Sequence, residues 1–229
     1  MRNFILVLFL VSWSNSSAWA QFKDEISETG HLDRIVHRNE KFAYFLSNSQ
    51  WRTRRIFVCW EPSINDHEDE KKWVQEAISK SWEQYSKLEF SGWGVCSNQN
   101  RGIRIAIEDI GPHVKALGSF LDGMRDGMVL NFSFKQWSST CRENENMRRD
   151  CIRSIAVHEF GHAIGFAHEQ NRLDRESSCF ERPQGSNGDA LLTPYDARSV
   201  MNYCNPRYNN NGELSDLDIV AVRQLYGAK

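Results

Sequence analysis

Alternation of apolar and polar residues predicts β-strands at four places in the chain. The strictest case is the segment 102–108, in which Ile103, Ile105 and Ile107 fall on one face. The other three candidates are 56–60, 88–93 and 128–134. Runs of this length that are rich in β-branched and aromatic residues are typical of strands with at least one face in a core.

Apolar residues recur at helical spacing elsewhere. Trp73, Ala77, Trp82 and Tyr85 are separated by intervening charges, which predicts one helix over 67–87. Two further helices are predicted, one over about 146–164 and one that ends at Tyr226.

The last helix carries its own start signal. Ser215 is a good N-cap, and Asp218 stands three residues later in a capping-box-like position. The segment 169–198 is polar and irregular, without either periodicity. The order strand, helix, three strands, helix, irregular segment, helix predicts a single α+β domain over residues 51–229.

The first twenty residues have the pattern of a secretory signal. A positive Arg2 precedes the apolar run 4–11, and Ala18-Trp19-Ala20 offers small residues for cleavage before Gln21. The apolar run is too short for a membrane span, which needs about 20 residues. We therefore expect a secreted protein, or a periplasmic one in a Gram-negative host.

Residues 21–50 are polar and are interpreted as a short propeptide that ends somewhere in 46–55, an ordinary N-terminal arm being the alternative. They contain no cysteine, so a thiolate from this segment cannot block a metal. Asp24 and Asp33 are carboxylate candidates for that role, although both could simply be solvated.

Composition excludes several kinds of partner. The chain is 40% hydrophobic and 25% charged, with a formal net charge of −2. Removal of a signal takes Arg2 and no acidic residue, which moves −2 to −3. No basic patch for nucleic acid and no polybasic membrane segment is present. We expect a monomer that binds neither nucleic acid nor, after signal removal, a membrane.

An HExxHxxGxxH motif begins at His158. In a helix His158 and His162 lie one turn apart on one face, so both imidazoles can reach one ion. Gly165 can leave the helix at positive φ and bring His168 round as a third ligand. Three nitrogen ligands with an open fourth position predict one catalytic Zn²⁺ per chain, with Glu159 as the base beside it. The other four histidines lack such a motif and are interpreted as surface residues: His31, His37, His67 and His113.

The stretch from this motif onward resembles the astacin family of metzincin zinc peptidases. The segment 158–176 reads HEFGHAIGFAHEQNRLDRE, in which Glu169, Arg172, Asp174 and Arg175 follow the third histidine with the family's spacing. The segment 199–203 is similar to a Met-turn.

Within that Met-turn, Tyr203 stands two residues after Met201, where astacins keep a tyrosine near the metal. Two features depart from the family. Met201 follows His168 by only 33 positions, and the chain has six cysteines instead of four. The resemblance indicates a compact, divergent member.

The resemblance implies a two-lobed metzincin fold. A twisted mixed sheet with two helices would form an upper lobe, and an irregular lower lobe with a C-terminal helix would follow Gly165. Substrate would lie in the cleft between them. The strand 128–134 is expected at the sheet edge facing that cleft, where an extended peptide could add to it, an interior strand being the alternative.

The resemblance also implies the chemistry: a zinc-dependent endopeptidase in which Glu159 is the general base and Tyr203 hydrogen-bonds the oxyanion. Glu169 would meet the mature N-terminus, or else be a surface carboxylate. Two other functions remain open. One is a catalytically silent zinc-binding toxin or adhesion module, against which Glu159 argues. The other is a zinc hydrolase of a non-peptide substrate.

Six cysteines in an exported chain favour three disulfides. We predict Cys59–Cys96 between the first strand and the end of the next, and Cys141–Cys151 as a short loop before the motif helix. Cys179–Cys204 would then tie the irregular lobe to the residue after Tyr203.

Overall fold

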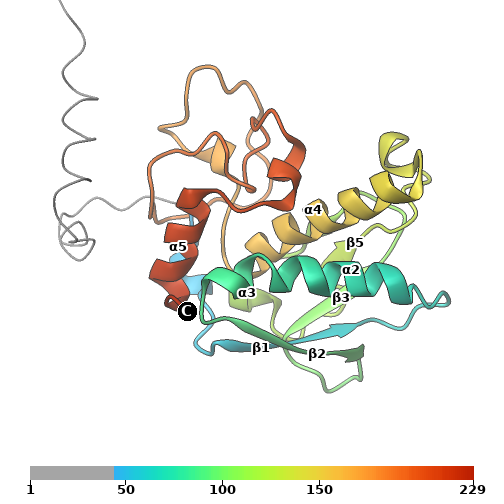
Figure 1. Ribbon diagram of the computed structural model, residues 1–229. Coiled ribbons are helices and arrows are strands. Elements are labelled where there is room, and N and C mark those ends of the chain that lie inside the picture. The colour runs from blue at the N-terminus through green and yellow to red at the C-terminus, as the bar shows by residue number, and fades with distance from the viewer. Residues whose placement is uncertain (1–43) are drawn as a thin grey trace, which may run out of the picture. The chain divides into compact units, whose positions relative to one another are not determined.

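The computed structural model describes residues 44–229. The predicted signal, Asp24, Asp33, His31, His37 and most of the predicted propeptide lie outside these residues. The described part contains a mixed five-stranded sheet in the order β2-β1-β3-β5-β4 (Figure 1). Its strands are β1 (Arg55–Trp60), β2 (Glu89–Val95), β3 (Ile103–Ile107), β4 (His113–Val114) and β5 (Met128–Leu130). β4 is antiparallel to β5, and the other pairs are parallel.

The prediction that the strand 128–134 forms a sheet edge is wrong, because β5 lies between β3 and β4 inside the sheet. Met128, Val129 and Leu130 are all at most 2% exposed. Burial on both faces is typical of an interior strand. The edge on this side of the sheet is β4 instead, whose two residues pair with no strand other than β5 among the described residues. So short a strand leaves no alternation in the sequence by which it could be found.

The helices are α2 (Glu68–Ser79), α3 (Trp82–Tyr85), α4 (Glu145–Ala163) and α5 (Asp216–Tyr226). The single helix predicted over 67–87 is wrong, because the backbone leaves helical geometry at Ser81 (φ −118°, ψ −100°). The Ser81 hydroxyl donates to the carbonyl of Ala77 at 2.7 Å. Such local bonds offer the backbone an alternative to a continuous helix.

α4 matches its prediction closely and begins at an Asn144 cap, whose side chain accepts from the backbone N–H of Met147. α2 and α4 pack together against the sheet (Figure 1). The ring of Phe160 on α4 meets Phe90 of β2 edge-on at 5.1 Å and stacks on Trp93 at 5.8 Å. This aromatic contact fixes α4, and with it the HExxH residues, on the sheet.

Beyond α4 the chain is irregular as far as α5, apart from the short 3-10 turns η5 (Glu169–Asn171) and η6 (Tyr208–Gly212). α5 begins with the predicted capping box of Ser215 and Asp218. Among the described residues no helix is long and apolar enough to cross a bilayer. All three predicted disulfides are present: Cys59–Cys96, Cys141–Cys151 and Cys179–Cys204.

Residues 44–50 belong to the folded body, although the sequence pattern places them in the propeptide. Phe45 is 2% exposed and forms antiparallel bridges with Phe166 and Ala190. Its ring meets that of Phe166 edge-on at 5.8 Å. Ser47 donates from its backbone N–H and its hydroxyl to the Asp189 carboxylate, at 2.7 and 2.8 Å.

Phe45→Ala should therefore destabilise the protein by about 3–5 kcal/mol, the usual cost of truncating a buried phenylalanine. Urea unfolding would measure the change. Phe180→Ala is the matched control, since Phe180 is 88% exposed and its loss should stay within about 0.5 kcal/mol. A loss below about 1 kcal/mol for Phe45→Ala would mean that this segment is not part of the stable core.

Candidate active site

Three histidines converge at the junction of α4 and the irregular lobe. His158 and His162 lie one turn apart on α4, and Gly165 (φ 107°) turns the chain so that His168 joins them. The Nε2 atom of His168 lies 3.2 Å from that of His158 and 3.1 Å from that of His162. No other group of three possible metal ligands occurs among the described residues.

Each imidazole is oriented through its other ring nitrogen. The Nδ1 atoms donate to backbone carbonyls: His158 to Val200 at 2.6 Å, His162 to Phe166 at 2.7 Å and His168 to Gln184 at 3.0 Å. A carbonyl can only accept, so Nδ1 carries the proton and each Nε2 presents a lone pair to the shared point.

The donor set fits zinc. Tetrahedral Zn–N bonds of about 2.0–2.1 Å place neighbouring nitrogens about 3.3 Å apart, close to the two distances above. Burial lowers the pKa of His158 to about 3, and it lowers the pKa of His162 and His168 as well. All three rings are thus neutral near pH 7, the form that binds a metal. A zinc ion would be held by His158, His162 and His168, and three protein ligands leave a position open.

Glu159 lies beside this cluster and lines the same cleft. It is 4% exposed, and its Oε2 atom has no hydrogen-bond partner among the described residues. Burial raises the pKa of Glu159 to about 8. The charge of a cation held by the three nitrogen donors would favour the ionised form of Glu159, and its oxygen without a protein partner is then suited to hold a water and accept its proton.

Tyr203 covers the other side of the cluster. Its ring stacks on His158 with centroids 5.3 Å apart and lies 4.5 Å from the ring of His168. Burial raises the pKa of its phenol well above the usual value, so the hydroxyl stays protonated and can donate. The backbone N–H of Tyr203 donates to Oε1 of Gln170 at 3.1 Å.

Met201 packs beneath the histidines, as a Met-turn would. It is 2% exposed, and a Cβ atom built on Gly161 would come within 2.3 Å of its sulfur. Gly161 lies in the helical turn between the two α4 ligands, so the thioether contacts the backbone that carries them. The Met201 carbonyl also accepts from the N–H of Glu169 at 2.9 Å, which joins the turn to the start of the lower lobe.

Glu159, His162, His168 and Tyr203 line a cleft of about 350 Å³. One wall is the β4 segment 112–117, and the other includes residues 184–186. His113, interpreted from the sequence as an ordinary surface residue, is exposed but belongs to this wall. A larger cavity of about 1180 Å³ lies along α4, and none of the three histidines lines it.

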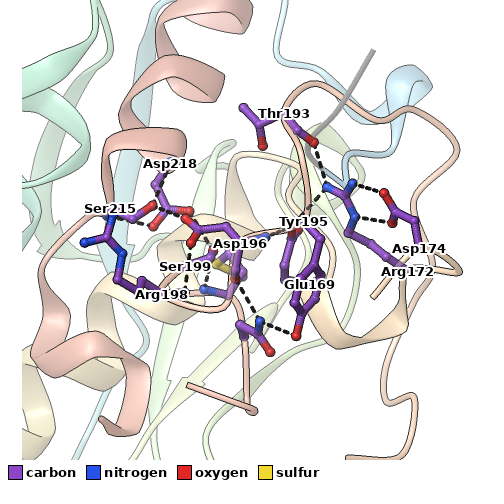
Figure 2. A network of polar contacts seen from close by, with 12 residues as sticks. Glu169, Arg172, Asp174, Thr193, Tyr195, Asp196, Arg198, Ser199, Ser215 and Asp218 are labelled. Carbon is purple, nitrogen blue, oxygen red and sulfur yellow. Dashed lines mark hydrogen bonds and ion pairs between the residues drawn. The ribbon is translucent and has the colours of Figure 1, made fainter. Parts of the chain in front are cut away.

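Glu169 is buried, so its interpretation as a surface carboxylate is wrong. Nη1 of Arg172 donates to Glu169 at 3.0 Å and to the carbonyl of Thr193 at 2.9 Å (Figure 2). Arg172 also forms a two-bond contact with Asp174 at 2.8 and 2.6 Å. Burial raises the pKa of Glu169 to about 8, and the charge of Arg172 opposes that rise.

The chain is similar in sequence to zinc peptidases of the astacin type. The sequence model of the Astacin peptidase family matches residues 139–223. Meprin A subunit beta of Rattus norvegicus is 32% identical over 111 residues, which are 34% of this chain and 16% of meprin. Zinc metalloproteinase nas-6 of Caenorhabditis elegans is 27% identical over 122 residues, 38% of this chain and 36% of nas-6. The matched region thus spans well under half the length of these relatives.

Solved structures agree on the fold. Myroilysin superposes with a TM-score of 0.57 at 16% identity, over 81% of this chain and 99% of its own. High choriolytic enzyme 1, a hatching enzyme zinc-protease from Oryzias latipes, gives a TM-score of 0.51 at 18% identity, over 83% of this chain and 100% of its own. The expected fold, a mixed sheet and two helices above an irregular lobe, is confirmed.

Proposed function

Because the chain is an astacin-like metzincin, we propose that it is a zinc-dependent endopeptidase that hydrolyses peptide bonds. The observation that carries the proposal is the convergence of three neutral Nε2 atoms, next to an unpartnered Glu159 oxygen, at one cleft. We further propose one zinc per chain, export from the cell and a monomeric enzyme.

Zinc bound to the three histidines would act as a Lewis acid that lowers the pKa of a water towards about 7 and polarises the carbonyl to be attacked. Glu159 takes the proton from the attacking water and then delivers it to the leaving nitrogen. The protonated phenol of Tyr203 donates to the oxyanion that forms on the carbonyl. His113 and Lys115 line the same cleft, where they would contact the chain being cut.

The free edge of β4 supports a peptide as the substrate. Within residues 44–229 β4 pairs with β5 on one side only, and its residues line the cleft with Glu159, His162 and His168. An extended peptide adding to this edge would bring its own carbonyls past the three histidines. This placement favours a peptidase over a hydrolase of a non-peptide substrate.

The position of the cut that removes the N-terminal segment is part of the same proposal. Since Phe45 is buried and Ser47 hydrogen-bonds to Asp189, a cut at 46–50 would separate the buried Phe45 from the rest of the domain. We therefore propose that processing occurs upstream of Tyr44 and not within 46–55. Glu169 then lies in the buried network of the lower lobe, where a new N-terminus could meet it, as the family resemblance implies.

Metal removal tests the proposed function. Casein cleavage by the purified protein should stop when a phenanthroline-type chelator strips the metal, because the three histidines alone cannot polarise a carbonyl. Added Zn²⁺ should restore it, and metal analysis should return one zinc per chain. A phenanthroline isomer that cannot chelate is the control. Bound zinc without casein cleavage would favour the silent binding module, and cleavage of purified cell wall alone would favour the non-peptide hydrolase.

A further inference from the structure

The backbone of Val200 connects a zinc ligand to the last helix through the two peptide groups that flank its Cα. Its carbonyl accepts from Nδ1 of His158 at 2.6 Å, and its N–H donates to Oδ2 of Asp218 on α5 at 3.0 Å. Val200 is fully buried and directly precedes Met201. A displacement of the backbone at Val200 would therefore turn the His158 ring away from the shared point.

Asp218 also bonds to Ser199, the residue before Val200, and to Ser215 at the start of its own helix (Figure 2). Its Oδ1 accepts from the hydroxyl of Ser199 at 2.6 Å, and its Oδ2 also accepts from the N–H of Ser215 at 3.0 Å. The Ser199 oxygen in turn accepts from the N–H of Met201 at 3.0 Å. The carboxylate thus restrains Ser199 and Val200 directly, and Met201 through Ser199.

α5 is a rigid support for this carboxylate. Ala221, Val222 and Tyr226 are each at most 1% exposed. At its far end the Tyr226 hydroxyl donates to the carbonyl of Ile164 at 2.7 Å, next to the end of α4. The helix is therefore anchored independently of Asp218, and the Met-turn is held against it.

From this geometry we infer that Asp218 is a positioning residue for the metal centre: its carboxylate holds the N–H of Val200, and the carbonyl on the other side of the same Cα fixes the ring of His158. The inference rests on the proposed zinc function, but it concerns a residue 50 positions after the third histidine of the HExxHxxGxxH motif. The capping box of α5 thereby acquires a second role, since its third helical residue, Asp218, also orients a ligand.

Zinc affinity is the readout that separates positioning from simple stability. Asp218→Ala should raise the dissociation constant for zinc by about 10–100-fold, the usual effect of losing a group that orients a metal ligand. Asp218→Asn should stay within a few-fold of the parent, because its amide oxygen can still accept from Val200 while its NH₂ donates to the oxygen of Ser199. Competition with a zinc chelator measures the zinc affinity of the folded, purified parent protein and of both variants.

Tyr226→Phe is the matched control, since it loosens the same helix at the opposite end without touching the Met-turn. It should lower the unfolding midpoint and leave zinc affinity at the parental value. If it weakens zinc as much as Asp218→Ala does, the effect is general destabilisation and the inference fails.

Ser199→Ala covers the case in which Asp218→Ala does not fold, and it should then weaken zinc binding several-fold. If Asp218→Ala folds and binds zinc as tightly as the parent protein, the inference is overturned. If Asp218→Ala does not fold, parental zinc affinity in Ser199→Ala overturns it instead. Absence of zinc binding by the parent protein would instead overturn the proposed function.

Discussion

Glu159→Gln should lower the rate of peptide cleavage by about 10²–10⁴, the usual worth of a positioned general base. The amide is nearly isosteric with the carboxylate but cannot accept the proton of the attacking water. Glu159 does not bind the zinc in the proposed site, so the zinc content of the variant should remain at the parental level. Steady-state kinetics on one fluorogenic peptide, with metal analysis of the same sample, gives both numbers.

Glu159→Asp is the control for the charge. It keeps a carboxylate but draws it back by one methylene, so its activity should fall between those of the parent and Glu159→Gln. Parental activity in Glu159→Gln would show that another group removes the proton, and the mechanism proposed above would be wrong.

Tyr203→Phe should lower kcat by about 10²–10³, the range for losing one oxyanion donor, while KM moves little. The hydroxyl makes its bond mainly in the transition state, so its removal affects turnover more than substrate binding. The ring of the variant can still stack on His158, and we expect fold and zinc content to be unchanged.

Tyr85→Phe is a suitable comparison, because that side chain lines the larger cavity and not the zinc cleft. Its kcat should stay within a few-fold of the parent. The same small change in Tyr203→Phe would mean that Tyr203 is only a packing residue beneath the histidines.

Features with short-range causes were predictable from the sequence. The motif histidines are brought together by one helical turn and one glycine at positive φ, and both are visible in eleven residues. The Ser215 and Asp218 capping box likewise depends on residues three apart. The Cys141–Cys151 pair closes a short local loop, which sequence spacing alone suggests.

Other features were missed, although two disulfides between distant residues, Cys59–Cys96 and Cys179–Cys204, were predicted correctly. The place of β5 in the sheet is decided by its pairing with β3 and β4, and β4 is too short to leave a pattern. The break at Ser81 depends on a hydroxyl bond that competes with an otherwise good helical periodicity. The contact between Asp218 and Val200 spans 18 residues, so the capping signal at Ser215 gave no hint of its second role.

One measurement tests the central claim most directly: a mass-spectrometric digest of a peptide library by the purified, processed protein, beside Glu159→Gln. The account predicts new peptide termini at internal bonds, at a common set of residues, that appear with the parent protein and are strongly reduced with the variant. A library that the zinc-loaded parent leaves intact, or that both proteins cut equally, would contradict it.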